Sequence, residues 1–133
     1  RVAWGRVSMP LNQWQPDENA DPVQAAGAGQ LNNNVRQAME MAQTLAKKKI
    51  PFVVSAWQAP RWALAANNAA PGTRGAGKAR INAGKWDGLS KAIGSYIEYM
   101  KQNYGAEPAL FSFNESDGGY DVLQSPQEHA ETI

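Results

Sequence analysis

The chain has 133 residues, of which 43% are hydrophobic and 19% are charged, and its formal net charge is +1. This composition indicates one globular domain, and the near-neutral charge gives no reason to expect nucleic acid or an acidic membrane as a partner. No apolar run approaches the length of a membrane span. The absence of cysteine excludes disulfides and thiolate metal sites, and His129 has no second histidine to share a metal with. We therefore expect no metal site.

Strands and helices are predicted to alternate along the chain. Short apolar runs predict strands at residues 2–11, 50–57 and 108–115, and the last of these has the continuous apolar character of a strand that is buried on both faces. Apolar residues that recur at steps of three and four predict helices at residues 31–49 and 86–104.

The connections that follow strands are much longer than those that precede them. Residues 12–30 and 58–84 are long connections rich in Asn and Gly, whereas each helix is followed by the next strand within a few residues, the second time through Gly105 as a helix stop. This asymmetry places the long loops at the carboxyl ends of parallel strands, as in a (β/α)8 barrel. We therefore expect an α/β fold, a partial (β/α)8 TIM barrel with three parallel strands that alternate with helices.

The chain is too short to hold a complete barrel, which takes about 250 residues. Residues 1–133 are therefore expected to be the N-terminal half of a barrel domain, incomplete and cut within a last helix that begins in a capping box at Ser125. Because a half barrel exposes its strand edges, such a fragment is also expected to self-associate.

Three segments at the predicted strand ends carry polar or aromatic residues. Residues 111–115 (FSFNE) end a strand in an Asn-Glu pair, residues 54–62 (VSAWQAPRW) place a Trp at a strand end before a Pro and a second Trp, and residues 7–11 (VSMPL) end the first strand. In this order the segments resemble the fourth, third and second strands of the clan A glycoside hydrolases. The segment with the two tryptophans is similar to that of the family 30 members, and the resemblance spans most of the chain.

The resemblance implies a retaining glycoside hydrolase that cleaves β-glycosidic bonds in a polysaccharide or glycoside. Glu115 would be the general acid/base, and Asn114 would contact the sugar 2-hydroxyl. The nucleophilic carboxylate of this clan lies on the seventh strand, which this chain does not contain, so the chain alone is expected to be inactive. The resemblance further implies a carbohydrate substrate, an extracellular or periplasmic location and no cofactor. The simpler interpretation of Asn114 and Glu115 is the solvated start of a loop.

Aromatic and basic residues near these strand ends are candidate substrate-binding residues. The resemblance implies that Trp57 and Trp62 are stacking platforms for sugar rings, and Trp14 in the first long connection is a third candidate. Arg61 could reach substrate hydroxyls. For the tryptophans the alternative is packing in the core or under a loop, and for Arg61 it is an ordinary surface position.

The first strand departs from the pattern of the clan. Many members carry, two residues before the proline-like position, an arginine that helps to hold the nucleophile, and this chain has Ser8 there. Arg6 lies two residues earlier and points in the same direction as Ser8, one layer deeper, because side chains alternate along a strand. Whether Arg6 takes over the role of that arginine is left open by the sequence.

Two other functions are compatible with the predicted elements. The first is a non-catalytic carbohydrate-binding barrel that uses Trp14, Trp57 and Trp62. The second is a flavodoxin-like domain with strand order 2-1-3 that binds a nucleotide or phosphate, but no predicted strand is followed directly by a short glycine-rich turn. Residues 72–79 (GTRGAGKA) resemble a phosphate-binding P-loop and fall short of it, because Ala79 stands where the magnesium-binding Ser or Thr is needed.

Overall fold

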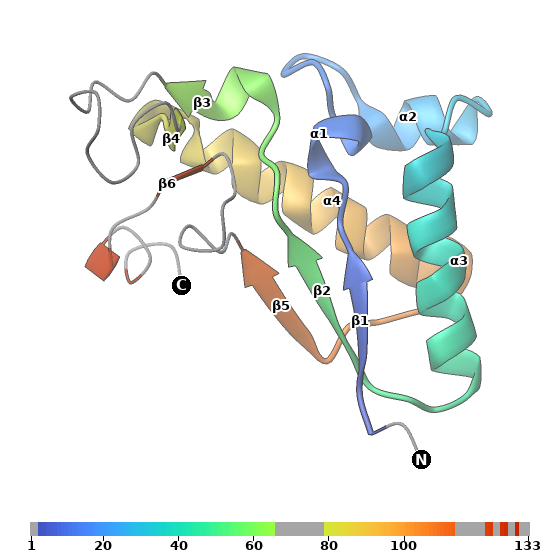
Figure 1. Cartoon of the computed structure of the whole chain (residues 1–133). Helices are drawn as coiled ribbons and strands as arrows, with labels where there is room; N and C mark the ends of the chain where they lie inside the picture. Colours follow the sequence, from blue (N-terminus) through green and yellow to red (C-terminus); the bar gives the residue numbers. More distant parts are fainter. Residues whose placement is uncertain (1–2, 66–78, 114–121, 124–125, 128–129, 131–133) are drawn as a thin grey trace.

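The computed structural model describes residues 3–65, 79–113, 122–123, 126–127 and 130 (Figure 1). Several positions discussed above lie outside the described residues: Asn114, Glu115, Ser125, His129 and the segment 72–78. Of the helix expected to begin at Ser125, the structure describes Pro126, Gln127 and Ala130, and all three are helical.

A parallel sheet in sequential order forms the centre of the fold. The strands β1 (Gly5–Ser8), β2 (Phe52–Ala56) and β5 (Leu110–Phe113) lie in the order β1-β2-β5, with β2 in the middle (Figure 1). This confirms three parallel strands that alternate with helices. It also contradicts the flavodoxin-like alternative, which requires the first strand to lie between the other two.

Two long helices, α3 (Asn33–Lys47) and α4 (Trp86–Tyr104), pack against this sheet and against each other. In Figure 1 α4 passes behind the sheet and α3 runs beside β1. The helix α4 has the predicted bounds, and Gly105 ends it with φ of 61°, a left-handed conformation that glycine adopts without steric cost. Buried side chains from the sheet, the helices and the segment after β1 form one core, which includes Val7, Met9, Leu11, Trp14, Val35, Met39, Phe52, Val54, Leu89, Tyr96 and Met100.

Gly5 allows α3 to approach β1 closely. A Cβ atom at this position would lie 2.5 Å from Cδ1 of Leu45 on α3, far inside van der Waals contact. The missing side chain therefore sets how tightly the helix covers the edge of the sheet, and any larger residue would have to displace Leu45.

The long connections contain more regular structure than the sequence suggested. The first holds the short helices α1 (Leu11–Trp14) and α2 (Pro22–Gly27), and Asp21 caps α2 by accepting hydrogen bonds from Val23 N and Gln24 N, both at 3.0 Å. An Asp followed by a Pro is a local signal for a helix start that the interpretation of 12–30 as a loop overlooked.

The second connection contributes to a small additional sheet that the sequence did not predict. Its order is β3-β4-β6, with β3 antiparallel and β6 parallel to β4. Two 3₁₀ turns, η1 and η2, flank β3 and β4 in the chain. The bounds of these elements are η1 Arg61–Ala63, β3 Leu64–Ala65, β4 Ala79–Ile81, η2 Ala83–Lys85 and β6 Val122–Leu123. Pairing of such short strands depends on distant partners, so no local pattern announces it.

The expectation that β5 is buried on both faces is wrong for its first half. Leu110 is 57% exposed and Phe111 is 41% exposed, although they point to opposite faces of the sheet. The cause is the position of β5 at an edge of the three-stranded sheet, whereas β2 between two neighbours is almost wholly buried.

None of the helices in the described part of the chain is both long and apolar enough to cross a membrane.

Candidate functional site

One face of the central sheet carries polar side chains toward the carboxyl ends of its strands. The parallel register aligns Ser8 with Ser55, and Ser55 in turn with Ser112, so these three residues share a face. Arg6 lies on the same face of β1, since Arg6 and Ser8 are exposed while Val7 between them is buried in the core. The predicted common direction of Arg6 and Ser8 is thus confirmed.

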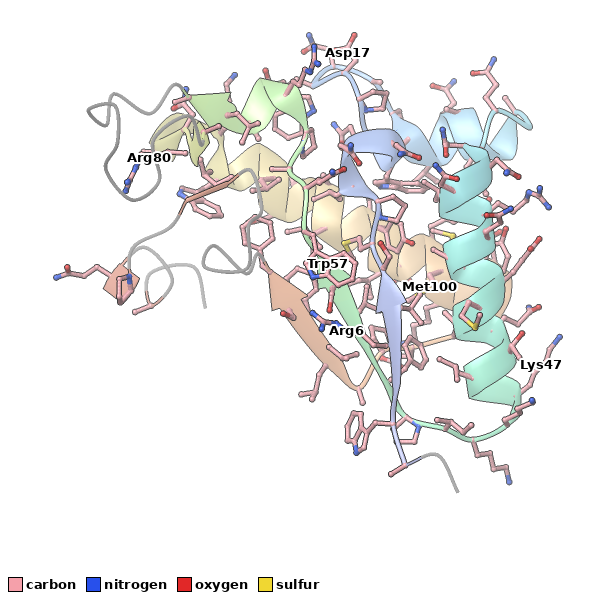
Figure 2. All side chains as sticks on the ribbon, in the orientation of Figure 1. Arg6, Asp17, Lys47, Trp57, Arg80 and Met100 are labelled. Atoms are coloured by element: carbon pink, nitrogen blue, oxygen red, sulfur yellow. The ribbon has the colours of Figure 1, made fainter. Side chains whose placement is uncertain are left out.

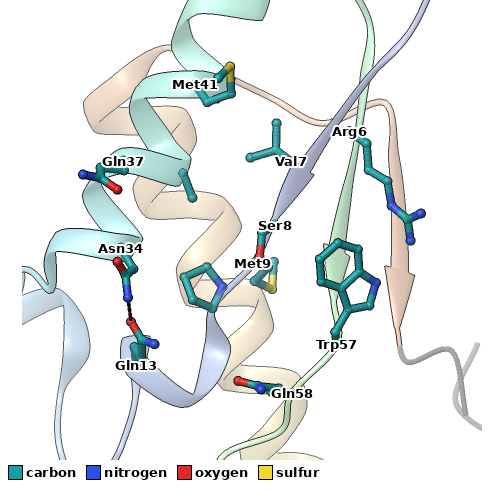
Figure 3. Close-up of a pocket in the computed structure, with 12 residues that line it drawn as sticks. Arg6, Val7, Ser8, Met9, Gln13, Asn34, Gln37, Met41, Trp57 and Gln58 are labelled. Carbon is teal, nitrogen blue, oxygen red and sulfur yellow. Dashed lines mark hydrogen bonds between the residues drawn. The ribbon is translucent and has the colours of Figure 1, made fainter. Parts of the chain in front are cut away.

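Arg6 contacts Trp57, which directly follows β2. Its guanidinium carbon lies 4.9 Å from the centroid of the indole ring (Figures 2 and 3). Its Nε donates a 2.9 Å hydrogen bond to Oγ of the buried Ser55. A cation over an indole face is attracted by the ring quadrupole, and the bond to Ser55 fixes where the cation lies. Arg6 therefore holds the ring of Trp57 in place at the carboxyl end of the sheet.

A cavity of about 530 Å³ lies beside Trp57, between β1 and α3 (Figure 3). Its lining comes from three segments far apart in sequence: the end of β1 with α1, one face of α3, and the residues after β2. The lining residues are Arg6, Val7, Ser8, Met9, Pro10, Gln13, Asn34, Gln37, Ala38, Met41, Trp57 and Gln58.

Carboxamide side chains connect the segments around the cavity. Nδ2 of Asn34 on α3 donates a 2.8 Å hydrogen bond to Oε1 of Gln13 on α1, and Nδ2 of Asn12 donates a 2.9 Å hydrogen bond to Oε1 of Gln58. None of these four residues stood out as a candidate in the sequence. A spacing of three and four on α3 (Asn34, Gln37, Ala38, Met41) was a visible signal, but nothing in the sequence showed which element that face would meet.

The structure places Trp14 in the core rather than at a ligand-binding surface. Its side chain is 4% exposed, its Nε1 donates a 3.0 Å hydrogen bond to Oγ of Ser95, and its ring meets the ring of Tyr96 edge-on with 5.5 Å between the centroids. No face of the ring is left for a sugar to stack on. The expectation that Trp14 binds substrate is therefore corrected to core packing between α1 and α4.

Trp62 and Arg61 lie on η1, away from the cavity. Nε1 of Trp62 donates a 2.9 Å hydrogen bond to the carbonyl oxygen of Gln15, and the half-buried ring packs close to Gly88 on α4. Arg61 is exposed. Of the four residues expected to bind substrate, Trp57 is the one that lines the cavity.

Asn114 and Glu115 follow the last residue of β5 directly in the sequence. That last residue, Phe113, is paired with Ala56, the last residue of β2, and Trp57 follows Ala56 in the sequence. Trp57 and Asn114 thus each follow, in the sequence, the last residue of a strand, and these two last residues are paired with each other. The geometry of Asn114 and Glu115 themselves lies outside the described residues.

A parallel sheet in sequential order, with long helices packed on it and polar residues at its carboxyl ends, defines a protein of the (β/α)-barrel class. Among solved structures, the chain is similar to a GH30 endoxylanase from Clostridium papyrosolvens, with a TM-score of 0.65 and 14% identity. The match covers 98% of this chain and 38% of that one, so the chain spans well under half of its structural neighbour. No protein-family model and no curated protein matches the sequence. At 14% identity the likeness shows a shared fold.

Proposed function

We propose that this chain is part of a retaining glycoside hydrolase of clan A that cleaves β-linked polysaccharides or glycosides. The observation that carries the proposal is the pairing of Arg6 with Trp57 at the carboxyl ends of parallel strands, where active sites of barrel enzymes lie. The similarity in fold to an endoxylanase supports it, as does the Asn114-Glu115 pair directly after β5.

In this proposal Glu115 acts twice. It first protonates the glycosidic oxygen as the bond to the anomeric carbon breaks, while a second carboxylate forms a covalent glycosyl-enzyme intermediate. It then accepts a proton from the water that hydrolyses this intermediate. Asn114 hydrogen-bonds the sugar 2-hydroxyl, a contact that strengthens in the transition state. The second carboxylate is not assigned to any residue of this chain.

Trp57 binds the substrate through its indole face. The C–H surface of a pyranose ring is apolar and packs on an aromatic plane, so a tryptophan at the strand end fixes the plane of the sugar. Arg6 keeps this platform from rotating, because a rotation of the ring would break the cation–π contact.

The test is Glu115→Gln, measured as the release of reducing ends from an unactivated β-1,4-xylan by the protein that carries this chain. Loss of a general acid/base lowers the rate about 10²- to 10⁴-fold. Glu107→Gln is the matched control: its ion pair with Lys101 is exposed, so the rate should not change. Unchanged hydrolysis by Glu115→Gln would reject the assignment.

One observation favours a second candidate function, a non-catalytic carbohydrate-binding barrel. The cavity beside Trp57 has no carboxylate among its lining residues, so the described part of the site can bind a sugar without the groups that cleave it. This candidate predicts affinity for a β-glycan without release of reducing ends at any pH, and turnover by the protein would exclude it.

A further inference from the structure

The polar lining of the cavity between β1 and α3 consists largely of carboxamides. Gln13, Asn34, Gln37 and Gln58 contribute to it, and the bond from Asn34 to Gln13 ties α3 to α1 across one end (Figure 3). A carboxamide carries both hydrogen-bond donors and acceptors, and one bond between two carboxamides uses only part of that capacity. Hydroxyl groups also donate and accept, so this lining matches a ligand that is rich in hydroxyls.

Apolar side chains also line the cavity. Trp57 and Pro10 contribute flat rings, and Met9 and Met41 contribute flexible thioethers, of which Met41 is 54% exposed. Side chains of this kind pack against C–H groups. A ligand with both hydroxyls and C–H surface therefore matches both kinds of lining, and a volume of about 530 Å³ lies within the range of small-molecule sites.

The charge of the lining argues for an uncharged ligand. Among the described residues, Arg6 is the one ionisable residue that lines the cavity, and its guanidinium already bonds Ser55 and lies over Trp57. The described lining offers a cationic ligand no carboxylate. An anionic ligand would have to draw Arg6 away from the two contacts that fix it, which costs both of them.

We propose that this cavity is a subsite for an uncharged sugar unit of a glycan. Trp57 packs on the C–H face of the sugar, and the carboxamides of Gln13 and Asn34 select its hydroxyls, assisted by Gln37. The ligand class rests on the proposed function. The new element is that residues of α1 and α3, outside the strand ends, choose which sugar binds.

Isothermal titration of the protein that carries this chain with xylotetraose, cellotetraose and laminaritetraose tests the proposal. The Glu115→Gln background is used because the proposed function expects it not to consume the substrate. The double variant Gln13→Ala/Asn34→Ala should bind the preferred tetrasaccharide about tenfold more weakly, because two hydrogen-bonding groups are lost. Gln37→Ala should weaken binding about threefold. The matched control is Gln24→Ala, the same change on the exposed surface of α2 outside the cavity, and it should bind like the parent.

Two results would overturn the inference: no binding of any of the three glycans at millimolar concentration, or equal binding by the parent, Gln37→Ala and the double variant. Gln37 is exposed, so its variant reports on binding even if the double variant does not fold. The outcome is separate from the catalytic proposal. Hydrolysis that survives Glu115→Gln, with binding lost in the cavity variants, rejects the catalytic role and supports the subsite.

Discussion

At the scale of single residues, Tyr96 shows what complete burial does to a polar side chain. It is 0% exposed on α4, and among the described residues its hydroxyl has no hydrogen-bond partner. Burial raises the pKa of the Tyr96 phenol well above its ordinary value, and the neighbouring Tyr104 phenol raises it further. Tyr96 is therefore neutral in the folded protein. Its ring packs in the core, and the burial of its hydroxyl lowers the stability of the fold by the cost of desolvation.

We predict that Tyr96→Phe leaves the free energy of unfolding at pH 7 unchanged or raises it by up to about 1 kcal/mol, because no hydrogen bond is lost. The folded pKa lies above the unfolded value of about 10, so the stability linked to this group is present below pH 10 and is lost as the pH rises beyond it. Urea unfolding at pH 7, 9 and 11 should show a smaller alkaline loss for Tyr96→Phe than for the parent. A destabilisation above about 2 kcal/mol at pH 7 would mean that the hydroxyl has a partner.

At the scale of elements, the turn from α3 to β2 contains a backbone conformation that its sequence does not favour. Lys49 has φ of 53°, a left-handed value, while its N–H donates to the carbonyl oxygen of Ala46 and Ile50 N–H donates to that of Leu45. The position is a helix C-terminal stop of the kind that glycine occupies after α4. A side chain with a Cβ is strained there, and the helix end is held by its hydrogen bonds.

Lys49→Gly is therefore expected to raise the free energy of unfolding by about 0.5–1 kcal/mol, the relief of the left-handed strain less the larger entropy of glycine in the unfolded chain. Thermal unfolding followed by circular dichroism measures the change. Lys48→Gly is the control, because Lys48 has φ of −84° and gains nothing from glycine, so it should be neutral or destabilised by up to about 1 kcal/mol. Equal shifts in both variants would show that charge, not backbone strain, matters.

At the scale of the whole molecule, both edges of the central sheet present apolar side chains. Leu110 and Phe111 are exposed on β5, and at the other edge Trp4 is 51% exposed near β1. Exposed strand edges with apolar side chains are sites of association, and charged residues on the edge oppose it. Self-association of the 133-residue chain through these edges stays a prediction.

We expect the 133-residue chain to sediment as a concentration-dependent oligomer, and Leu110→Lys with Phe111→Lys to shift it toward the monomer, because two lysines on the edge of β5 disfavour pairing. The control is Val23→Lys. Val23 is an apolar residue that is 45% exposed, and it lies on the helix α2 rather than on the sheet, so its change should leave the association unchanged. A monomeric parent at all concentrations would contradict the role of the edges.

Features that rest on local chemistry could be predicted from the residues alone. The period of apolar residues and the glycine stop predicted the bounds of α4, and the contrast between long and short connections predicted that β1, β2 and β5 run parallel. These inferences succeed because a helix period or a helix stop acts over a few residues. The helix α2 carried such a signal too, in Asp21 and the proline after it.

The role of each tryptophan and the place where a ligand could bind became clear only from the packing of the folded chain. Trp14 and Trp57 were both candidates for sugar stacking, yet Trp14 packs against Tyr96 in the core while Trp57 lies beside Arg6 at the cavity. The cavity itself joins residues 6–13, 34–41 and 57–58, which come together only when β1, α3 and β2 pack. The physical reason is that burial and pocket chemistry depend on partners distant in sequence, which no local pattern specifies.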